Sequence, residues 1–238
     1  MSNYQYHVDI VFCIDCTETM NNVLSIVKSN ALRFYSDLQA AMAKYNKPID
    51  KLRVRIVAFR DYLSYAEETK RSNTANYPML ETDFFTLPEE ANKFEASVRS
   101  LYAMGGGDQE EDALEALAHA IRSDWDFDKA NLHRHVIVLW TDAAPHELGF
   151  GKNAPVYPKG MAKDFSELTA WWGFHSAPGA MKLQDAKRLL LFAPKTEAWE
   201  NLAKIWNQTI LYPSEAGKGL SEVSYQSILS VLAGSINN

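Results

Sequence analysis

The chain has 238 residues, of which 47% are hydrophobic and 23% charged, and its formal net charge is −6. That length and apolar content suffice for one large α/β domain with a full hydrophobic core over residues 1–238. No run of about 18 apolar residues occurs, which excludes a membrane-spanning helix. The negative charge, without any stripe rich in lysine and arginine, argues against nucleic acid and membranes as partners.

The first residues and the two cysteines bear on the compartment. Residues 1–7 carry neither the basic start nor the apolar stretch of a secretory signal, so we expect a cytoplasmic protein. Cys13 and Cys16 form a Cys-x-x-Cys pair, as redox motifs and half of some zinc sites do. A redox pair normally opens a helix, however, whereas Cys13 lies inside a predicted strand, and no second pair completes a zinc site. We therefore interpret both as small core or loop residues.

Predicted strands and helices alternate along the chain. Val8 to Asp15 is a continuous apolar run, typical of a parallel strand buried on both faces. A helix over 22–45 is predicted by apolar residues that recur near a period of 3.6. The other predicted strands are Lys51–Tyr62, an edge strand at Glu81–Leu87, Arg134–Thr141, Lys187–Phe192 and Gln208–Tyr212, and the other helices are Glu89–Tyr102, Ala113–Ile121, Glu197–Trp206 and Ser221–Ile236. This order predicts a three-layer αβα fold, doubly wound, with a mostly parallel six-stranded sheet and one antiparallel edge strand.

A long connection interrupts this pattern between the fourth and fifth strands. It spans about 45 residues, over 143–187, with a short helix expected from Ala162 to Trp172; a connection of that length in a compact domain is usually functional or mobile. Its aromatic side chains are candidates for one wall of a ligand surface. They are Tyr157, Phe165, Trp171, Trp172, Phe174 and His175. The alternative is that the adjacent tryptophans pack the insertion onto its own domain, and we expect this of one of the two.

Residues with side-chain oxygens gather at three places near strand ends. Asp15, Thr17 and Thr19 follow the first strand at alternate positions, which lets their side chains converge from one extended turn. A second loop, Gly105 to Asp112, is rich in carboxylates, and Asp142 follows the strand that ends at Thr141. The carboxyl ends of parallel strands meet at one edge of a sheet, where α/β proteins bind ligands. An all-oxygen set suits Mg²⁺ and suits zinc poorly.

With these three loops, the chain resembles a von Willebrand factor type A domain with a metal-ion-dependent adhesion site, from about His7 to Ile236. The family has Asp-x-Ser/Thr-x-Ser/Thr in its first loop, Thr or Glu in its second and Asp in its third. The resemblance implies that Thr17 and Thr19 bind the cation directly, and Asp15 and Asp142 directly or through water. It implies a Rossmann-like fold and a non-enzymatic adaptor that uses Mg²⁺, or alternatively Mn²⁺ or Ca²⁺. A carboxylate of the partner protein then completes the coordination.

The second loop reads Asp108-Gln109-Glu110-Glu111. Some relatives, including the inserted domain of integrin β subunits, use Asp-x-Pro-Glu, whose Glu binds the cation; here Glu110 stands at the proline position. The resemblance therefore implies Glu111 as the ligand, with Asp108 as an alternative or supporting carboxylate. Both acids also suit the positive end of the following helix. Family members often serve beside ATPases, kinases or phosphatases, so we expect a partner from such a system that presents an Asp or Glu.

Other candidate residues are weaker. Asp61 is interpreted either as a hydrogen-bond partner of metal-bound water or as half of a surface ion pair. His133 and His135 share a strand face, but no third zinc ligand is near them in sequence. His146 is interpreted as orienting the third loop. The main alternative function is a Mg²⁺-dependent phosphohydrolase of the haloacid dehalogenase type, whose motif needs an Asp where this chain has Thr17. A scaffold with a vestigial metal motif is a third interpretation.

Overall fold

The structure is a computed structural model that describes residues 4–64, 77–105 and 110–238. Within them, a seven-stranded sheet has the order β3-β2-β1-β6-β8-β9, and β4 also pairs with β2. The parallel strands are β1 (Tyr6–Asp15), β2 (Lys51–Phe59), β6 (Leu132–Trp140), β8 (Lys187–Pro194) and β9 (Thr209–Ser214); β3 (Met79–Glu81) and β4 (Phe85–Leu87) run antiparallel to β2.

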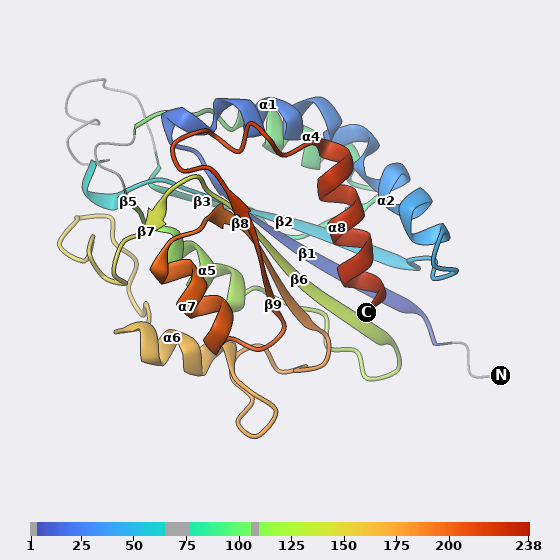
Figure 1. Cartoon of the computed structure of the whole chain (residues 1–238). Coiled ribbons are helices and arrows are strands. Elements are labelled where there is room, and N and C mark those ends of the chain that lie inside the picture. Colours follow the sequence, from blue (N-terminus) through green and yellow to red (C-terminus); the bar gives the residue numbers. More distant parts are fainter. Residues whose placement is uncertain (1–3, 65–76, 106–109) are drawn as a thin grey trace.

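Helices cover both faces of this sheet (Figure 1). One face carries α1 (Asn21–Asn30), α2 (Phe34–Ala43), α4 (Ala91–Ser100) and α8 (Tyr225–Asn237), and the other carries α5 (Ala113–Ile121), α6 (Phe165–Trp172) and α7 (Glu197–Ile205). Val8, Ile10 and Phe12 of β1 pack toward the first group, whereas Val11 and Cys13 pack toward the second. Successive side chains of a strand point to opposite faces, and here both faces are buried, so the strand is apolar at successive positions. The predicted three-layer αβα fold is confirmed.

The predicted edge strand, Glu81–Leu87, is wrong as a single strand. The ladder with β2 shifts by one residue between Glu81 and Phe85, which is the signature of a β-bulge. At the bulge the Thr82 hydroxyl accepts a hydrogen bond from the Ile56 N–H at 3.1 Å. A side-chain oxygen thus replaces a backbone carbonyl in the ladder, and the edge divides into β3 and β4.

Capping residues decide where the helices begin. Asp164 accepts a hydrogen bond from the Glu167 N–H at the start of α6, and Ser224 does the same for the Ser227 N–H at the start of α8. Both helices therefore begin three or four residues after the predicted starts, since the side chain of an N-cap residue satisfies the first free amides. The predicted helix over 22–45 is divided by a 3₁₀ turn at Ala31–Arg33.

Helix α6 of the 143–187 insertion packs beside α5 and α7 (Figure 1). Trp172 is fully buried and stacks on Trp206 with ring centroids 5.2 Å apart. Trp171 is half-buried, with the Arg122 guanidinium 4.9 Å from its ring centroid. The Lys187 ammonium closes the insertion by donating to the Trp172 carbonyl at 2.9 Å. The expectation that one of the two tryptophans packs the insertion onto its own domain is confirmed.

Two further sequence expectations concern cysteines and membranes. Cys13 and Cys16 are both buried and carry free thiols, as expected for core residues. No helix in the described part of the chain combines the length and the apolar character needed to cross a bilayer.

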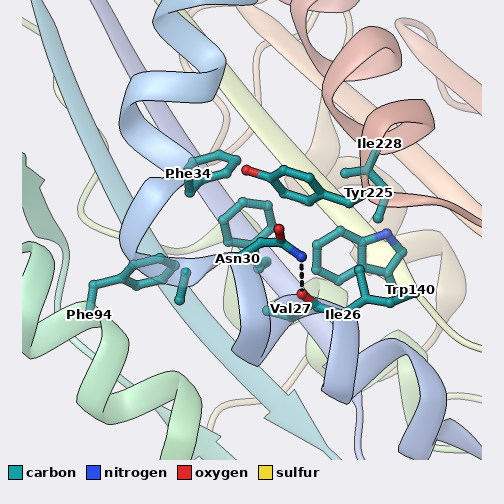
Figure 2. A pocket seen from close by; sticks show the side chains of 10 residues that line it. Ile26, Val27, Asn30, Phe34, Phe94, Trp140, Tyr225 and Ile228 are labelled. Carbon is teal, nitrogen blue, oxygen red and sulfur yellow. Dashed lines mark hydrogen bonds between the residues drawn. The ribbon is translucent and has the colours of Figure 1, made fainter.

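A small apolar cavity lies between the sheet and the helices of the first face (Figure 2). Its volume is about 30 Å³, room for about two water molecules. The Asn30 amide near it donates to the Ile26 carbonyl of its own helix at 2.7 Å (Figure 2). The cavity is lined by Phe12, Ile26, Val27, Asn30, Ala31, Phe34, Phe94, Trp140, Tyr225 and Ile228. These residues form a slightly loose region of the core, and we assign no ligand to it.

Candidate metal centre

Loop one begins where β1 ends, with a carboxylate that is already fully engaged. Asp15 is completely buried, and its Oδ1 accepts hydrogen bonds from the Thr17 amide at 2.8 Å and the Thr17 hydroxyl at 2.6 Å. Its Oδ2 accepts from the Thr141 hydroxyl at 2.7 Å, at the end of β6. Burial raises the pKa of Asp15 to about 6, although the hydrogen bonds from Thr17 and Thr141 oppose the rise. The ends of two neighbouring strands are thereby joined through one side chain.

Loop three is connected to loop one by a second hydroxyl. The Thr19 hydroxyl donates to Asp142 Oδ1 at 3.0 Å, and the Gly219 amide donates to Asp142 Oδ2 at 2.6 Å. Gly219 has a φ of +56°, and a Cβ there would lie 2.0 Å from the Thr19 carbonyl oxygen. Only glycine fits this approach without displacing loop one. Asp142 is therefore held from both sides, by loop one and by the segment that precedes α8.

Loop two reaches the same edge through a minimal two-stranded sheet. β5 (Glu110–Glu111) pairs in parallel with β7 (Ala144–Pro145), and Glu111 is buried. The Glu111 carbonyl also accepts a hydrogen bond from the His146 amide at 2.9 Å. The structure thus brings Glu111 beside loop three, and the other loop-two candidate, Asp108, lies outside the described residues.

The three loops surround an open cleft of about 680 Å³. Four carboxylates line it, from Glu18, Glu110, Glu111 and Asp142, and its described lining includes no lysine, arginine or histidine. The full lining is Thr17, Glu18, Thr19, Gly105, Glu110, Glu111, Asp142, Ala143, Ala144, Thr196, Ala216 and Gly217. The aromatic residues of the insertion are not in this set, so the expectation that they form a wall of the cleft is wrong. Phe165, Trp171 and Trp172 pack instead in the core cluster that contains α5 and α7, where their apolar area is buried, whereas His175 is exposed.

The interpretation of Asp61 as half of a surface pair is also wrong, because the segment that contains it is buried. The neighbouring Arg60 donates from Nε to the Cys16 carbonyl at 3.1 Å and from Nη1 to the Tyr77 carbonyl at 2.9 Å. The first of these bonds ties Arg60 to the backbone of loop one. Asp61 accepts the Leu63 amide at 2.6 Å, and its Oδ2 lies 3.6 Å from His146 Nε2.

Sequence reasoning missed three contributors to the centre: Thr141, Gly219 and Arg60. Thr141 directly precedes Asp142, but the acceptor of its hydroxyl, Asp15, is 126 positions away in the chain. Gly219 belongs to a Gly-x-Gly stretch that reads as an ordinary loop. No local signal distinguishes a glycine that tolerates a close approach from one that merely ends a helix.

No protein-family model matches the chain, and no curated protein matches it. Among solved structures, the chain is similar to the pilus adhesin SpaC from Lactobacillus rhamnosus GG in its open conformation, with a TM-score of 0.52 and 15% identity over 99% of this chain and 30% of the adhesin. A second structure of that adhesin has a TM-score of 0.52 at 12% identity, over 99% of this chain and 31% of the other. The chain thus spans less than a third of the adhesin's length, and the likeness shows a shared fold.

Proposed function

We propose that the chain is a type A module that binds a partner protein through a divalent cation, with Mg²⁺ as the resident ion. The hydrogen bond from Thr19 to Asp142 carries this proposal, because it joins loop one to loop three beside an acidic cleft. That juxtaposition is what the motif of the type A family requires. A partner that presents an Asp or Glu then completes the coordination.

The donor chemistry supports a hard cation. The Thr17 and Thr19 hydroxyls each donate their hydrogen bond to a carboxylate, so the lone pairs of both oxygens remain available to a cation. The described lining of the cleft carries four carboxylates and no basic side chain to balance them. Oxygen ligands with few direct carboxylates suit Mg²⁺, which keeps several of its waters.

Under this proposal Thr17, Thr19 and Glu111 hold the ion, while Asp15 and Asp142 orient the hydroxyls and balance the charge. When bound, the cation supplies an electrophilic position at which a partner carboxylate replaces water. The chain's own residues set where that position lies, since both threonines are locked by the carboxylates that they contact. The cleft is large enough for one acidic side chain with its flanking backbone.

The alternative function, a phosphohydrolase in which Asp15 attacks a phosphoester, is less well supported. Asp15 is fully buried, and both of its oxygens already accept hydrogen bonds from Thr17 and Thr141. A nucleophile needs an accessible oxygen within reach of the reacting atom. Turnover of p-nitrophenyl phosphate with Mg²⁺ that is abolished in Asp15→Asn would establish the enzyme instead.

Titration of the chelator-treated protein with Mg²⁺, followed by calorimetry and thermal shift, tests the proposal. We expect saturable, stabilising binding in the wild type and at least a tenfold weaker affinity in Asp142→Ala, or about 1.4 kcal/mol. Glu18→Gln is the matched control, because it removes the same charge from the same cleft but leaves the Thr19–Asp142 bond intact. Equal Mg²⁺ affinity in all three proteins would reject the proposed ion site.

The partner itself is proposed to belong to a cytoplasmic system that contains an ATPase, a kinase or a phosphatase. Affinity capture from the source cell with and without EDTA, followed by mass spectrometry, tests this. We expect a protein that is retained with Mg²⁺ and lost with EDTA or in Asp142→Ala. A partner retained equally in EDTA would show that the cation is not part of the interface.

A further inference from the structure

A second group of metal-ligating side chains lies beside the cleft but outside its lining. Asp61, Asp112 and His146 each offer a ligand atom, and these atoms all lie within 4.8 Å of one another. The residues come from separate segments: the end of β2, the start of α5 and the turn after β7. Their exposed fractions are 2%, 0% and 3%, so the group is enclosed.

Asp112 supplies the clearest sign that this group lacks a component. Its Oδ2 accepts the Tyr62 amide at 2.7 Å, whereas its buried Oδ1 has no hydrogen-bond partner among the described residues. Two neighbouring acids, Glu115 and Asp61, disfavour the charge on Asp112, and His146 favours it. An unpaired carboxylate oxygen in a low-dielectric interior is costly, and a cation removes that cost.

A carboxylate also lies near the second ring nitrogen of His146. Its Nδ1 lies 3.3 Å from Glu110 Oε2, and its ring stacks on Phe150 with centroids 4.0 Å apart. A carboxylate behind one ring nitrogen is the usual arrangement that directs the other nitrogen to a metal. Here that other nitrogen, Nε2, faces Asp61 Oδ2.

The spacing of these atoms fits shared coordination better than a direct hydrogen bond. Nε2 of His146 and Oδ2 of Asp61 are 3.6 Å apart, too far for a strong hydrogen bond. Two ligands that are each about 2.1 Å from a tetrahedral zinc ion lie about 3.4 Å from one another. These two atoms can therefore share one ion with little movement, and the ligand atom of Asp112 lies within 4.8 Å of both.

We propose that Asp61, Asp112 and His146 supply three ligands to a zinc ion, separate from the cation of the cleft, with water in the fourth position. One imidazole with two carboxylates suits zinc, whereas Mg²⁺ prefers oxygen ligands and retained waters. The ion would join the end of β2, the start of α5 and the first part of the insertion. Because all three ligands are buried, its role is to stabilise the arrangement of loops two and three.

Zinc binding by the full chain tests this proposal. The protein is stripped with chelator, returned to metal-free buffer and titrated with Zn²⁺ against a chromogenic competitor, with Tm and Co²⁺ absorption as parallel measurements. We expect one zinc per chain, a rise in Tm and a tetrahedral Co²⁺ spectrum. His146→Gln and Asp112→Asn should each weaken zinc binding at least tenfold. Asp112→Asn keeps the shape of the side chain and an oxygen for the Tyr62 amide, so it is the variant expected to fold normally.

Two variants separate this site from other sources of binding. Asp142→Ala should retain zinc while losing Mg²⁺, which distinguishes failure of this proposal from failure of the proposed function. His133→Gln removes a histidine from the opposite end of the sheet and should bind zinc like the wild type. Absence of zinc binding by the wild type, or wild-type zinc affinity in both His146→Gln and Asp112→Asn, would overturn the proposal.

Discussion

Two groups of potential metal ligands lie at opposite ends of the sheet, and they differ in the charges that surround them. His7, Asp126 and His133 gather where the strands begin, and Asp61, Asp112 and His146 gather beyond the strands' carboxyl ends. Both groups have ligand atoms within 4.8 Å of one another.

Within residues 4–64, 77–105 and 110–238, only the first group has a lysine bonded to one of its members. The Lys51 ammonium lies 2.8 Å from Asp126 Oδ2, and His7 Nδ1 lies 3.2 Å from the same oxygen. The acid of the second group, Asp112, faces other acids and one histidine. Proximity of ligands therefore does not by itself indicate a metal site; the balance of charge around them does.

The net pKa shifts of the two acids run in opposite directions, although burial raises both pKa values. Burial alone would raise the pKa of Asp126, but hydrogen bonds from Lys51 and the Asp128 amide hold it below its usual range. For Asp112, burial and the neighbouring charge of Glu115 together raise the pKa to about 7. A carboxylate with a cationic partner favours its charged form, and one without such a partner resists it.

The largest expected effect concerns Asp9, which adjoins the first group. Its carboxylate forms a two-point ion pair with Arg53, at 2.8 and 2.6 Å, and accepts the Asp126 amide at 2.8 Å. Asp9→Ala leaves the guanidinium largely buried without its partner, so we expect a loss of about 3–4 kcal/mol in the free energy of unfolding. Urea denaturation measures it, with the exposed Asp185→Ala as control. A loss no larger than that of the control would show that this edge does not depend on paired charges.

A smaller effect is expected for Asp126→Asn, at about 2 kcal/mol at pH 7, because charged hydrogen bonds from Lys51 and His7 are lost or weakened. The folded-state pKa of Asp126 lies below the unfolded value of about 4, so its contribution is complete above that pH. It is lost as the pH falls through the folded-state pKa. Stability measured from pH 7 to pH 2 should therefore show wild type and variant converging in acid, and a constant difference would contradict this account.

The smallest effect is expected for Asp112→Asn in the presence of chelator. The amide removes a buried charge that has no lysine or arginine partner among the described residues, so we expect the free energy of unfolding to stay level or rise by about 1 kcal/mol at pH 8. With saturating zinc the order should reverse, since the wild type binds the ion more tightly and gains more stability from it. If Asp112→Asn lowers the free energy of unfolding by 2 kcal/mol or more in chelator, the charge of Asp112 is already balanced by other groups. The two groups would then not differ in charge balance.

Local patterns in the sequence determined the layers of the fold and the first half of the candidate centre. Continuous apolar runs that alternate with segments of 3.6-residue period predicted parallel strands with helices on both faces, because a strand buried on both faces is apolar at successive positions. Asp15, Thr17 and Thr19 could be placed together because they share one turn. Asp142 could be placed beside them because parallel strands end at a common edge.

The tertiary structure alone decided which groups these residues contact. The sequence left Asp61 open between a partner of metal-bound water and half of a surface ion pair, because nothing near it in sequence shows that it is buried beside His146. Gly219 contacts loop one across almost the whole length of the chain. Hydrogen bonds and charge balance between distant segments depend on how those segments pack, and no pattern among neighbouring residues records which distant group each side chain contacts.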